Sequence, residues 1–290
     1  MNKLTIEKGN IKYEMLIDHY KIIYGHNYNS KFDILRTLLR FNNNIKPSEY
    51  AEEKNNIPNI SLNDKSIKTK DTFIYYVNKN YSIIDDFKLS TKSLIYKYLE
   101  ILLDDHQLMD TINTINILFE SLNNEISLIS DISCIFNSMV PKQLLKLLSP
   151  IYQINQLSQD EYDLSLEQII LFQLNLIDYI INNNHKINDF IICIEIPELT
   201  QEIFNKILRM NNVNILIFIE YKNSICKDIN KYFICERKCL DICDDDQVYL
   251  TICDNQFQFL NLKEGREYME KYLFNEESLE SRFIMKLLNI

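Results

Sequence analysis

The segment from residue 21 to residue 35 restricts the fold of this chain more than any other part of its sequence. It contains a short apolar run, Gly25, Lys31 six residues later, and then apolar residues at helical spacing. A strand, a loop opened by glycine, a lysine and a helix form the layout of a phosphate-binding loop, G-x-x-x-x-G-K-[ST]. Ser30 stands at the position of the second glycine, and Phe32 stands where the magnesium-binding hydroxyl belongs. The frame of the loop is therefore present, but two of its chemical positions are altered.

A working phosphate loop brings backbone N–H groups close to the phosphates and uses a hydroxyl to bind Mg²⁺. The side chain of Ser30 obstructs the close backbone approach, and Phe32 cannot bind Mg²⁺. We therefore expect a degenerate loop that keeps the corner of the fold and holds no nucleotide. The residues of this degenerate loop are Gly25, Asn27, Ser30 and Lys31.

A second part of the nucleotide-hydrolase pattern lies at residues 191–197, which read Ile-Ile-Cys-Ile-Glu-Ile-Pro. In ATP-binding-cassette ATPases the corresponding segment has four apolar residues followed by Asp, Glu and Pro. Glu195 takes the metal-side acidic position, whereas Ile196 replaces the general base, so nothing would orient or deprotonate the attacking water. Residues 164–168, Leu-Ser-Leu-Glu-Gln, resemble the cassette signature Leu-Ser-Gly-Gly-Gln with both glycines lost. We therefore predict an α/β fold like that of these ATPases, without catalytic residues and without enzymatic activity.

The pattern of apolar residues predicts an α/β head. Apolar runs at 190–195 and 213–219 flank a helical stretch at 199–210, which predicts a βαβ unit with parallel, buried strands. Alternation within residues 3–23, interrupted by Gly9-Asn10, predicts a hairpin. Short strands are also expected at 72–77, 81–84, 232–235 and 248–252, and a helix at 263–290.

The middle of the chain has a heptad pattern from Leu94 to Leu122 that only Asp105 interrupts. Such a pattern predicts one long helix packed along a partner, for which residues 164–182 offer a second apolar stripe. Since strand-like sequence resumes afterwards, we expect a helical leg inserted into the head; an ordinary helical bundle is the alternative. The predicted domains are a head formed by 1–89 and 186–260, a leg formed by 90–185, and a helical tail formed by 261–290.

The charge of the chain is uneven, although its net charge is −10. Residues 1–80 hold 13 Lys/Arg against 9 Asp/Glu, and the rest of the chain is strongly acidic. An acidic chain does not simply coat nucleic acid, but this asymmetry leaves room for one basic face on the N-terminal side. The basic stretch that contains Lys65, Lys68 and Lys70 is the candidate for contact with an anionic partner.

The seven cysteines, with no signal peptide ahead of them, are typical of a reduced cytoplasmic protein. No apolar run approaches the roughly 20 residues of a membrane span, so we expect no membrane association. Cys235, Cys239 and Cys243 recur every fourth residue; buried small hydrophobes are the favoured interpretation and a zinc site is the alternative. The acidic run at 244–246 is interpreted as a solvated loop, with a divalent-cation site as the alternative. No metal ligands can be assigned by motif.

The order of these parts resembles the Csn-two family of type II-A CRISPR-associated spacer-acquisition proteins, in its long subfamily. The resemblance is strongest at residues 189–242, where the strands follow the order of the family, and it extends to residues 25–35. It implies a non-catalytic, homotetrameric ring that binds double-stranded DNA from its ends without sequence preference, supported by calcium. For such a ring, we assign the DNA contacts to Lys65, Lys68 and Lys70. It also implies action with the CRISPR integrase proteins and the effector nuclease in antiviral defence.

Two other functions remain open at the level of the sequence. A divergent ATPase of the cassette or chromosome-maintenance type is suggested by Gly25, Lys31 and Glu195, and opposed by Phe32 and Ile196. A coiled-coil interaction scaffold is suggested by the heptad pattern.

Overall fold

The computed structural model describes residues 1–44, 57–104, 106–126, 135–154, 157–158, 160–253, 260–274 and 278–288. It divides the chain into two compact units, of which the first comprises Met1–Lys79 with His185–Ile290 and the second comprises Asn80–Asn184. The inserted segment thus begins about ten residues before the expected boundary at 90. The expected tail at 261–290 groups with the first unit.

The first unit is built on a six-stranded sheet in the order β12-β11-β3-β10-β9-β6. Five neighbouring strands run parallel, and only β12 is antiparallel to its neighbour β11. The predicted βαβ unit is present as β9, α7 and β10, and both strands are almost entirely buried, as expected for a sheet covered on both faces. The bounds are β3 Tyr20–Tyr24, β6 Thr72–Val77, β9 Asp189–Ile196, α7 Gln201–Arg209, β10 Asn214–Ile219, β11 Tyr232–Cys235 and β12 Cys239–Asp241.

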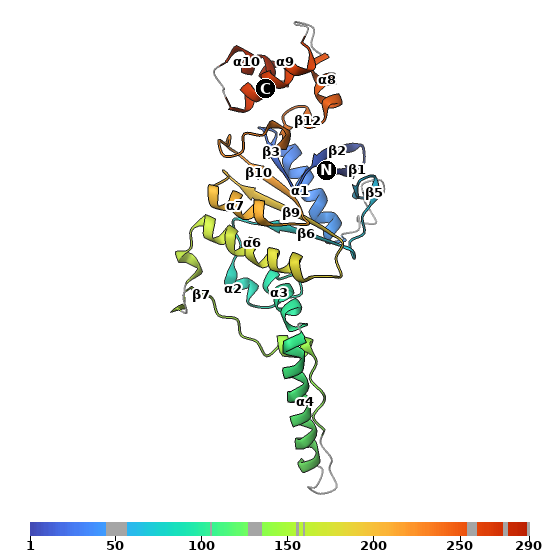
Figure 1. Cartoon of the computed structure of the whole chain (residues 1–290), viewed down its shortest axis with the longest axis vertical. Coiled ribbons are helices and arrows are strands. Elements are labelled where there is room, and N and C mark those ends of the chain that lie inside the picture. The colour runs from blue at the N-terminus through green and yellow to red at the C-terminus, as the bar shows by residue number, and fades with distance from the viewer. Residues whose placement is uncertain are drawn as a thin grey trace, which may run out of the picture. The chain divides into compact units, whose positions relative to one another are not determined.

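A four-stranded antiparallel sheet, in the order β2-β1-β4-β5, forms the other layer of this unit. The predicted hairpin is confirmed: β1 (Asn2–Lys8) pairs with β2 (Ile11–Ile17), and Gly9 turns the chain with φ +60°. The helix α1 (Tyr28–Asn42) lies between this sheet and the parallel sheet (Figure 1), and its apolar face contributes to one core with both. The remaining strands are β4 Asn59–Leu62 and β5 Lys65–Ser66.

Two expected strands are helices instead. Residues 81–84 lead into α2 (Ile83–Asp86), because the hydroxyl of Ser82 accepts a hydrogen bond from the N–H of Asp85 and caps a helix there. Residues 248–252 lie in α8 (Asp245–Cys253), which Asp244 caps. The tail forms two helices, α9 (Leu262–Phe274) and α10 (Leu279–Leu287), instead of one.

The single long heptad helix is also wrong, because the pattern is divided between α3 (Leu94–Leu103) and α4 (His106–Ile126). Asp104 is the C-cap of α3, at an end where the helix dipole disfavours a carboxylate; Asp105 lies outside the described residues. The expected packing against 164–182 holds for α3, which contacts α6 (Leu166–Asn183) and places the rings of Tyr98 and Tyr179 4.7 Å apart.

The second helix of the heptad pattern packs on non-helical chain. Asn116 of α4 exchanges hydrogen bonds with the backbone of Met139, at 2.7 and 3.1 Å, and Phe119 stacks on Phe136 with 5.4 Å between the ring centroids. The coiled-coil seam expected along α4 is therefore replaced, at these positions, by an extended segment that runs beside it in the second unit (Figure 1). The remaining elements of this unit are α5 Pro141–Leu145, β7 Gln153–Ile154, β8 Leu157–Ser158 and a 3₁₀ helix at Glu161–Asp163.

Among the described residues, no helix combines the length and the apolar character that a membrane crossing requires.

Candidate functional site

The corner between β3 and α1 contains the degenerate phosphate loop. β3 ends at Tyr24, Gly25 follows with φ +136°, and Asn27 caps α1 by accepting a hydrogen bond from the N–H of Ser30 at 3.1 Å. A Cβ added to Gly25 would lie 2.1 Å from the carbonyl oxygen of Cys235 on the neighbouring β11. Glycine is required here because the backbone approaches another strand and has positive φ, and not because it approaches a phosphate.

The backbone donors of this loop are used within the chain itself. The N–H of His26 donates to the carboxylate of Glu236 at 2.9 Å, and the N–H of Asn27 donates to the carbonyl of Cys235 at 3.0 Å. The N–H groups of Tyr28, Ser30 and Lys31 donate to residues 26 and 27 of the same loop. These five donors cannot bind a phosphate without breaking an existing hydrogen bond.

Glu236, the residue that follows β11, packs against this loop and hydrogen-bonds to it. Its residue is 3% exposed, and its carboxylate also accepts a hydrogen bond from the hydroxyl of Tyr272 on α9 at 3.1 Å. Nδ1 of His26 lies 2.9 Å from the same oxygen, and the side-chain amide of Asn27 donates to the carbonyl of Glu236 at 3.0 Å. An internal carboxylate thus accepts the first backbone N–H of the loop, which a bound anion would otherwise use. No sequence motif marks Glu236, and its one signal in the sequence is a carboxylate directly after the apolar run 232–235.

Lys31 is turned into the protein. It is 7% exposed, and its ammonium donates to the carbonyl of Ile219, at the end of β10, at 3.0 Å. The same ammonium lies 5.0 Å from the ring centroid of Tyr28. Burial lowers the pKa of Lys31, and nearby acidic groups, Glu220 and Glu195 among them, oppose that shift. Lys31 therefore stabilises the end of a strand instead of presenting its charge to a ligand.

A pocket of about 520 Å³ lies beside the first turns of α1, at the carboxyl ends of β6, β9 and β10. Ligands of open α/β sheets bind at this edge. Glu195 lines the pocket, and its carboxylate accepts a hydrogen bond from the hydroxyl of Tyr76. The structure brings Glu195 and Lys31 to one pocket, whereas Gly25 and Ser30 are not part of its wall. The lining residues are Tyr28, Asn29, Lys31, Phe32, Leu35, Arg36, Leu39, Tyr76, Glu195, Phe218, Ile219 and Glu220.

The three lysines assigned to DNA lie elsewhere in the first unit. Lys65 is in β5, and Lys68 and Lys70 are in the connection from β5 to β6. All three are exposed, and within the described part of the chain none of them forms an ion pair. Their ammonium groups are thus available to an external anion.

The cysteines and the acidic run have structural partners. Cys235 and Cys239 face each other across β11 and β12, and Cys235 is fully buried. The carboxylate of Asp244 accepts hydrogen bonds from the first turn of α8, and Asp245 forms an ion pair with Arg266 at 2.6 Å. Among the described residues, no group of three or more His, Cys, Asp or Glu side chains is arranged to hold a metal ion.

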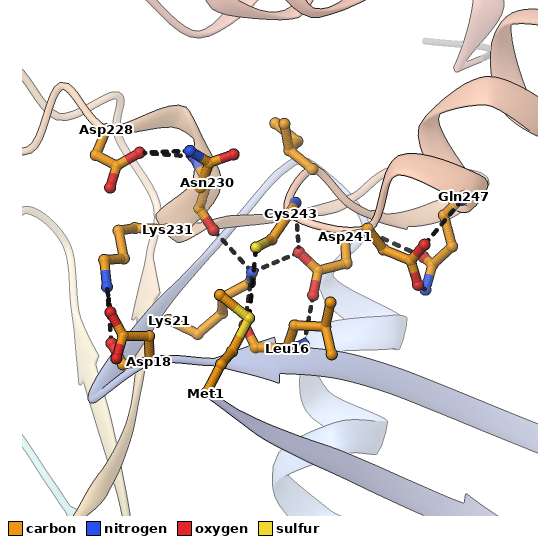
Figure 2. Close-up of polar contacts among 12 residues, drawn as sticks. Met1, Leu16, Asp18, Lys21, Asp228, Asn230, Lys231, Asp241, Cys243 and Gln247 are labelled. Carbon is orange, nitrogen blue, oxygen red and sulfur yellow. Dashed lines mark hydrogen bonds and ion pairs between the residues drawn. The ribbon is translucent and has the colours of Figure 1, made fainter. Parts of the chain in front are cut away.

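A buried ion pair joins β3 to β12 near the other end of β3 (Figure 2). Lys21 is fully buried and is paired with Asp241, and it also donates to the carbonyls of Leu16 and Asn230 at 3.0 and 2.9 Å. Asp241 accepts from the N–H groups of Leu16 and Cys243 at 2.6 and 2.9 Å. Burial lowers the pKa of Lys21 and raises that of Asp241, and each partner opposes the shift of the other.

Comparison with known proteins adds the fold and no more. No protein-family model matches the chain, and no curated protein matches its sequence. The crystal structure of Stu0660 of Streptococcus thermophilus is similar with a TM-score of 0.68 and 15% identity, over 99% of this chain and 92% of that chain. A structure of the recombination mediator protein RecF in the RecFOR pathway has a TM-score of 0.38 and 11% identity, over 80% of this chain and 95% of that chain. The first likeness shows that this chain and Stu0660 have the same fold over nearly their whole lengths.

Proposed function

We propose that this chain is a non-catalytic protein of the Csn-two type, which binds the ends of double-stranded DNA as a homotetrameric ring during CRISPR spacer acquisition. The observation that carries the non-catalytic half is the hydrogen bond from the N–H of His26 to the buried carboxylate of Glu236. A nucleotide phosphate would have to displace an internal carboxylate of the same charge, and it would find Lys31 already bonded to a carbonyl. Hydrolysis is disfavoured because a phosphate would have to displace Glu236 and because Ile196 stands where the water-activating carboxylate belongs.

The arrangement of the head supports a degenerate version of the nucleotide-hydrolase fold. Gly25 lies between the buried strand β3 and the helix α1, and Glu195 lies near the carboxyl end of β9, with only β10 between β3 and β9. A loop strand and an acidic strand that open to the same sheet edge are what the motif pattern requires. In this proposal the corner was kept for packing after its chemistry was lost.

The DNA-binding half rests on the resemblance and on charge. Binding without sequence preference needs only Lys or Arg on phosphates, and the exposed lysines at 65, 68 and 70 supply such groups. The full-length likeness to Stu0660 supports the order of elements on which the resemblance was based. The integrase proteins and the effector nuclease are proposed as partners on the resemblance alone, as is a cytoplasmic location. Calcium is likewise proposed as a cofactor on the resemblance alone, and its ligands are not assigned.

The test compares a short linear duplex with a covalently closed circle of the same sequence, with and without CaCl₂. We expect binding to the linear duplex, a much weaker response to the closed circle, and a tetramer by light scattering. A monomer that binds neither DNA, or one that binds both equally, contradicts the proposal. Binding of Mg·ATP that Lys31→Ala abolishes would support the divergent ATPase in its place.

A further inference from the structure

We propose that the pocket beside α1 binds an arginine side chain of a protein partner, so that a corner descended from an anion site now recognises a cation. The pocket holds about 520 Å³ and opens at the ligand-binding edge of the parallel sheet. Two carboxylates and two exposed aromatic rings line it together with Lys31 and Arg36, and five backbone N–H groups of the loop next to it are already bonded.

The loop beside the pocket offers little to an anion. Five of its backbone N–H groups are bonded within the chain, and the carboxylate of Glu236 receives one of them. Lys31 lines the pocket, and its ammonium already donates a hydrogen bond to the carbonyl of Ile219. An incoming phosphate would therefore meet two carboxylates, and these five backbone N–H groups would not be free to bind it.

The two carboxylates, Glu195 and Glu220, lie on one side of the sheet. Glu195 is the register partner of Phe218, and Glu220 follows Phe218 by two residues, so side-chain alternation places all three on the face that α1 covers. Glu195 receives one hydrogen bond from Tyr76 and keeps its second oxygen for another donor. Within the described part of the chain, the carboxylate of Glu220 has no hydrogen bond and no ion pair. A guanidinium group can bind such carboxylates through two parallel hydrogen bonds.

The rim supplies flat aromatic faces. Tyr28 and Phe32 lie one helical turn apart on α1, and each is 62% exposed, which is unusual for aromatic side chains at a helix–sheet junction. Both rings already contact cations: Lys31 lies 5.0 Å from the centroid of Tyr28, and Arg36 lies 5.5 Å from that of Phe32. Arginine is favoured over lysine as the ligand because its planar group combines bidentate pairing with stacking on a ring.

This inference goes beyond the proposed function and does not depend on it. DNA contact is assigned to lysines outside the pocket, so a variant of Glu220 should keep its affinity for linear DNA. Loss of peptide binding with DNA binding unchanged would separate the two sites.

The experiment measures fluorescence anisotropy of a labelled tri-arginine peptide with the full-length protein at fixed ionic strength. We expect Glu220→Gln and Glu195→Gln each to weaken binding roughly tenfold, since each removes a charge-assisted hydrogen bond. Phe32→Ala should weaken binding roughly threefold through loss of stacking. Arg36→Gln should strengthen it, because Arg36 competes for the same ring.

The matched control is Glu202→Gln. It removes the same charge from α7, on the opposite face of the sheet, where Phe204 contacts Tyr20 with 5.5 Å between the ring centroids. We expect the control to leave peptide affinity unchanged. If Glu202→Gln and Glu220→Gln weakened peptide binding equally, the effect would come from net charge alone and the proposal would be overturned. Tighter binding of ATP than of the peptide, or displacement of the peptide by equimolar CaCl₂, would also overturn it.

Discussion

The carboxylate of Glu236 accepts a hydrogen bond from the backbone N–H of His26 at 2.9 Å, directly after the glycine of the degenerate loop. We expect Glu236→Ala to lower the free energy of unfolding by about 2–3 kcal/mol, because the backbone N–H of His26 and the buried hydroxyl of Tyr272 lose a charged acceptor. Urea denaturation followed by circular dichroism measures this. The exposed Glu198 provides a control, Glu198→Ala, whose effect should stay within about 0.5 kcal/mol. Equal stability of the two variants would show that Glu236 does not hold the loop.

Gly25 is the second test of the same corner. Gly25→Ala places a Cβ 2.1 Å from the carbonyl of Cys235 at a φ of +136°, so strain alone should cost about 1–3 kcal/mol and the clash should add to it. Gly9→Ala is the matched control, because Gly9 has φ +60° in an exposed hairpin turn and should lose only about 1 kcal/mol. Thermal unfolding of both variants measures the two losses of stability. A smaller loss of stability in Gly25→Ala than in Gly9→Ala would contradict the close approach of Gly25 to the backbone of β11.

Lys21 and Asp241 form a fully buried ion pair between β3 and β12 (Figure 2). Lys21→Met should destabilise the fold by about 3–5 kcal/mol, because it leaves the carboxylate of Asp241 buried without a countercharge. Combining it with Asp241→Asn removes both charges and keeps an acceptor for Leu16, so the double variant should be more stable than Lys21→Met alone. Denaturant unfolding of the three proteins measures the coupling.

A control for this pair comes from an exposed lysine of the same unit. Lys12 forms an ion pair with Glu14 at 3.1 Å but is half exposed, so Lys12→Met should cost less than about 1 kcal/mol. A coupling energy near zero between Lys21 and Asp241 would contradict their assignment as a structural pair.

The parts of the fold that the sequence predicted correctly depend on local pattern. The apolar runs 190–195 and 213–219 are long enough, and near enough to the helix between them, to specify a βαβ unit on their own. Short apolar runs are ambiguous, and the runs at 81–84 and 248–252 contain helix because a single capping side chain, Ser82 or Asp244, starts each helix. The heptads from residue 94 to residue 122 gave the correct helical state but the wrong continuity.

The candidate site was less accessible to prediction, since its chemistry depends on long-range partners. The degeneracy of the loop could be inferred from Phe32 at the hydroxyl position. What fills the loop could not, because Glu236 lies 210 residues after His26 in the sequence. Lys21 lies in a short apolar run of the sequence, and its partner, Asp241, belongs to a strand that pairs with β11. Only the assembled sheet brings these residues together.

The cysteines differ in their expected reactivity. Hydrogen bonding from Cys235 lowers the pKa of the half-buried Cys239, whereas burial raises the pKa of Cys193 to about 12. Because the thiolate is the reactive form, iodoacetamide at pH 8 should modify Cys239 readily and Cys193 hardly at all, with about one in ten thousand of the latter ionised. Peptide mapping by mass spectrometry across a pH series should give Cys239 a lower midpoint in the folded protein than in urea. A midpoint that rises on folding, or modification of Cys193 at the same rate, would contradict this arrangement.

The exposed lysines at 65, 68 and 70 give the DNA-binding proposal its sharpest measurement. If each contacts a phosphate, replacing all three by glutamine should reduce the slope of log K against log salt concentration by about 0.9 for each lysine, and about 2.7 in total. The control replaces Lys3 and Lys12, both of which already pair with Glu14 at 2.9 and 3.1 Å, and it should change the slope by less than about 0.9. Titrations of a labelled linear duplex at several salt concentrations give both slopes. A triple variant that keeps the wild-type slope would place the DNA contact on another face of the protein.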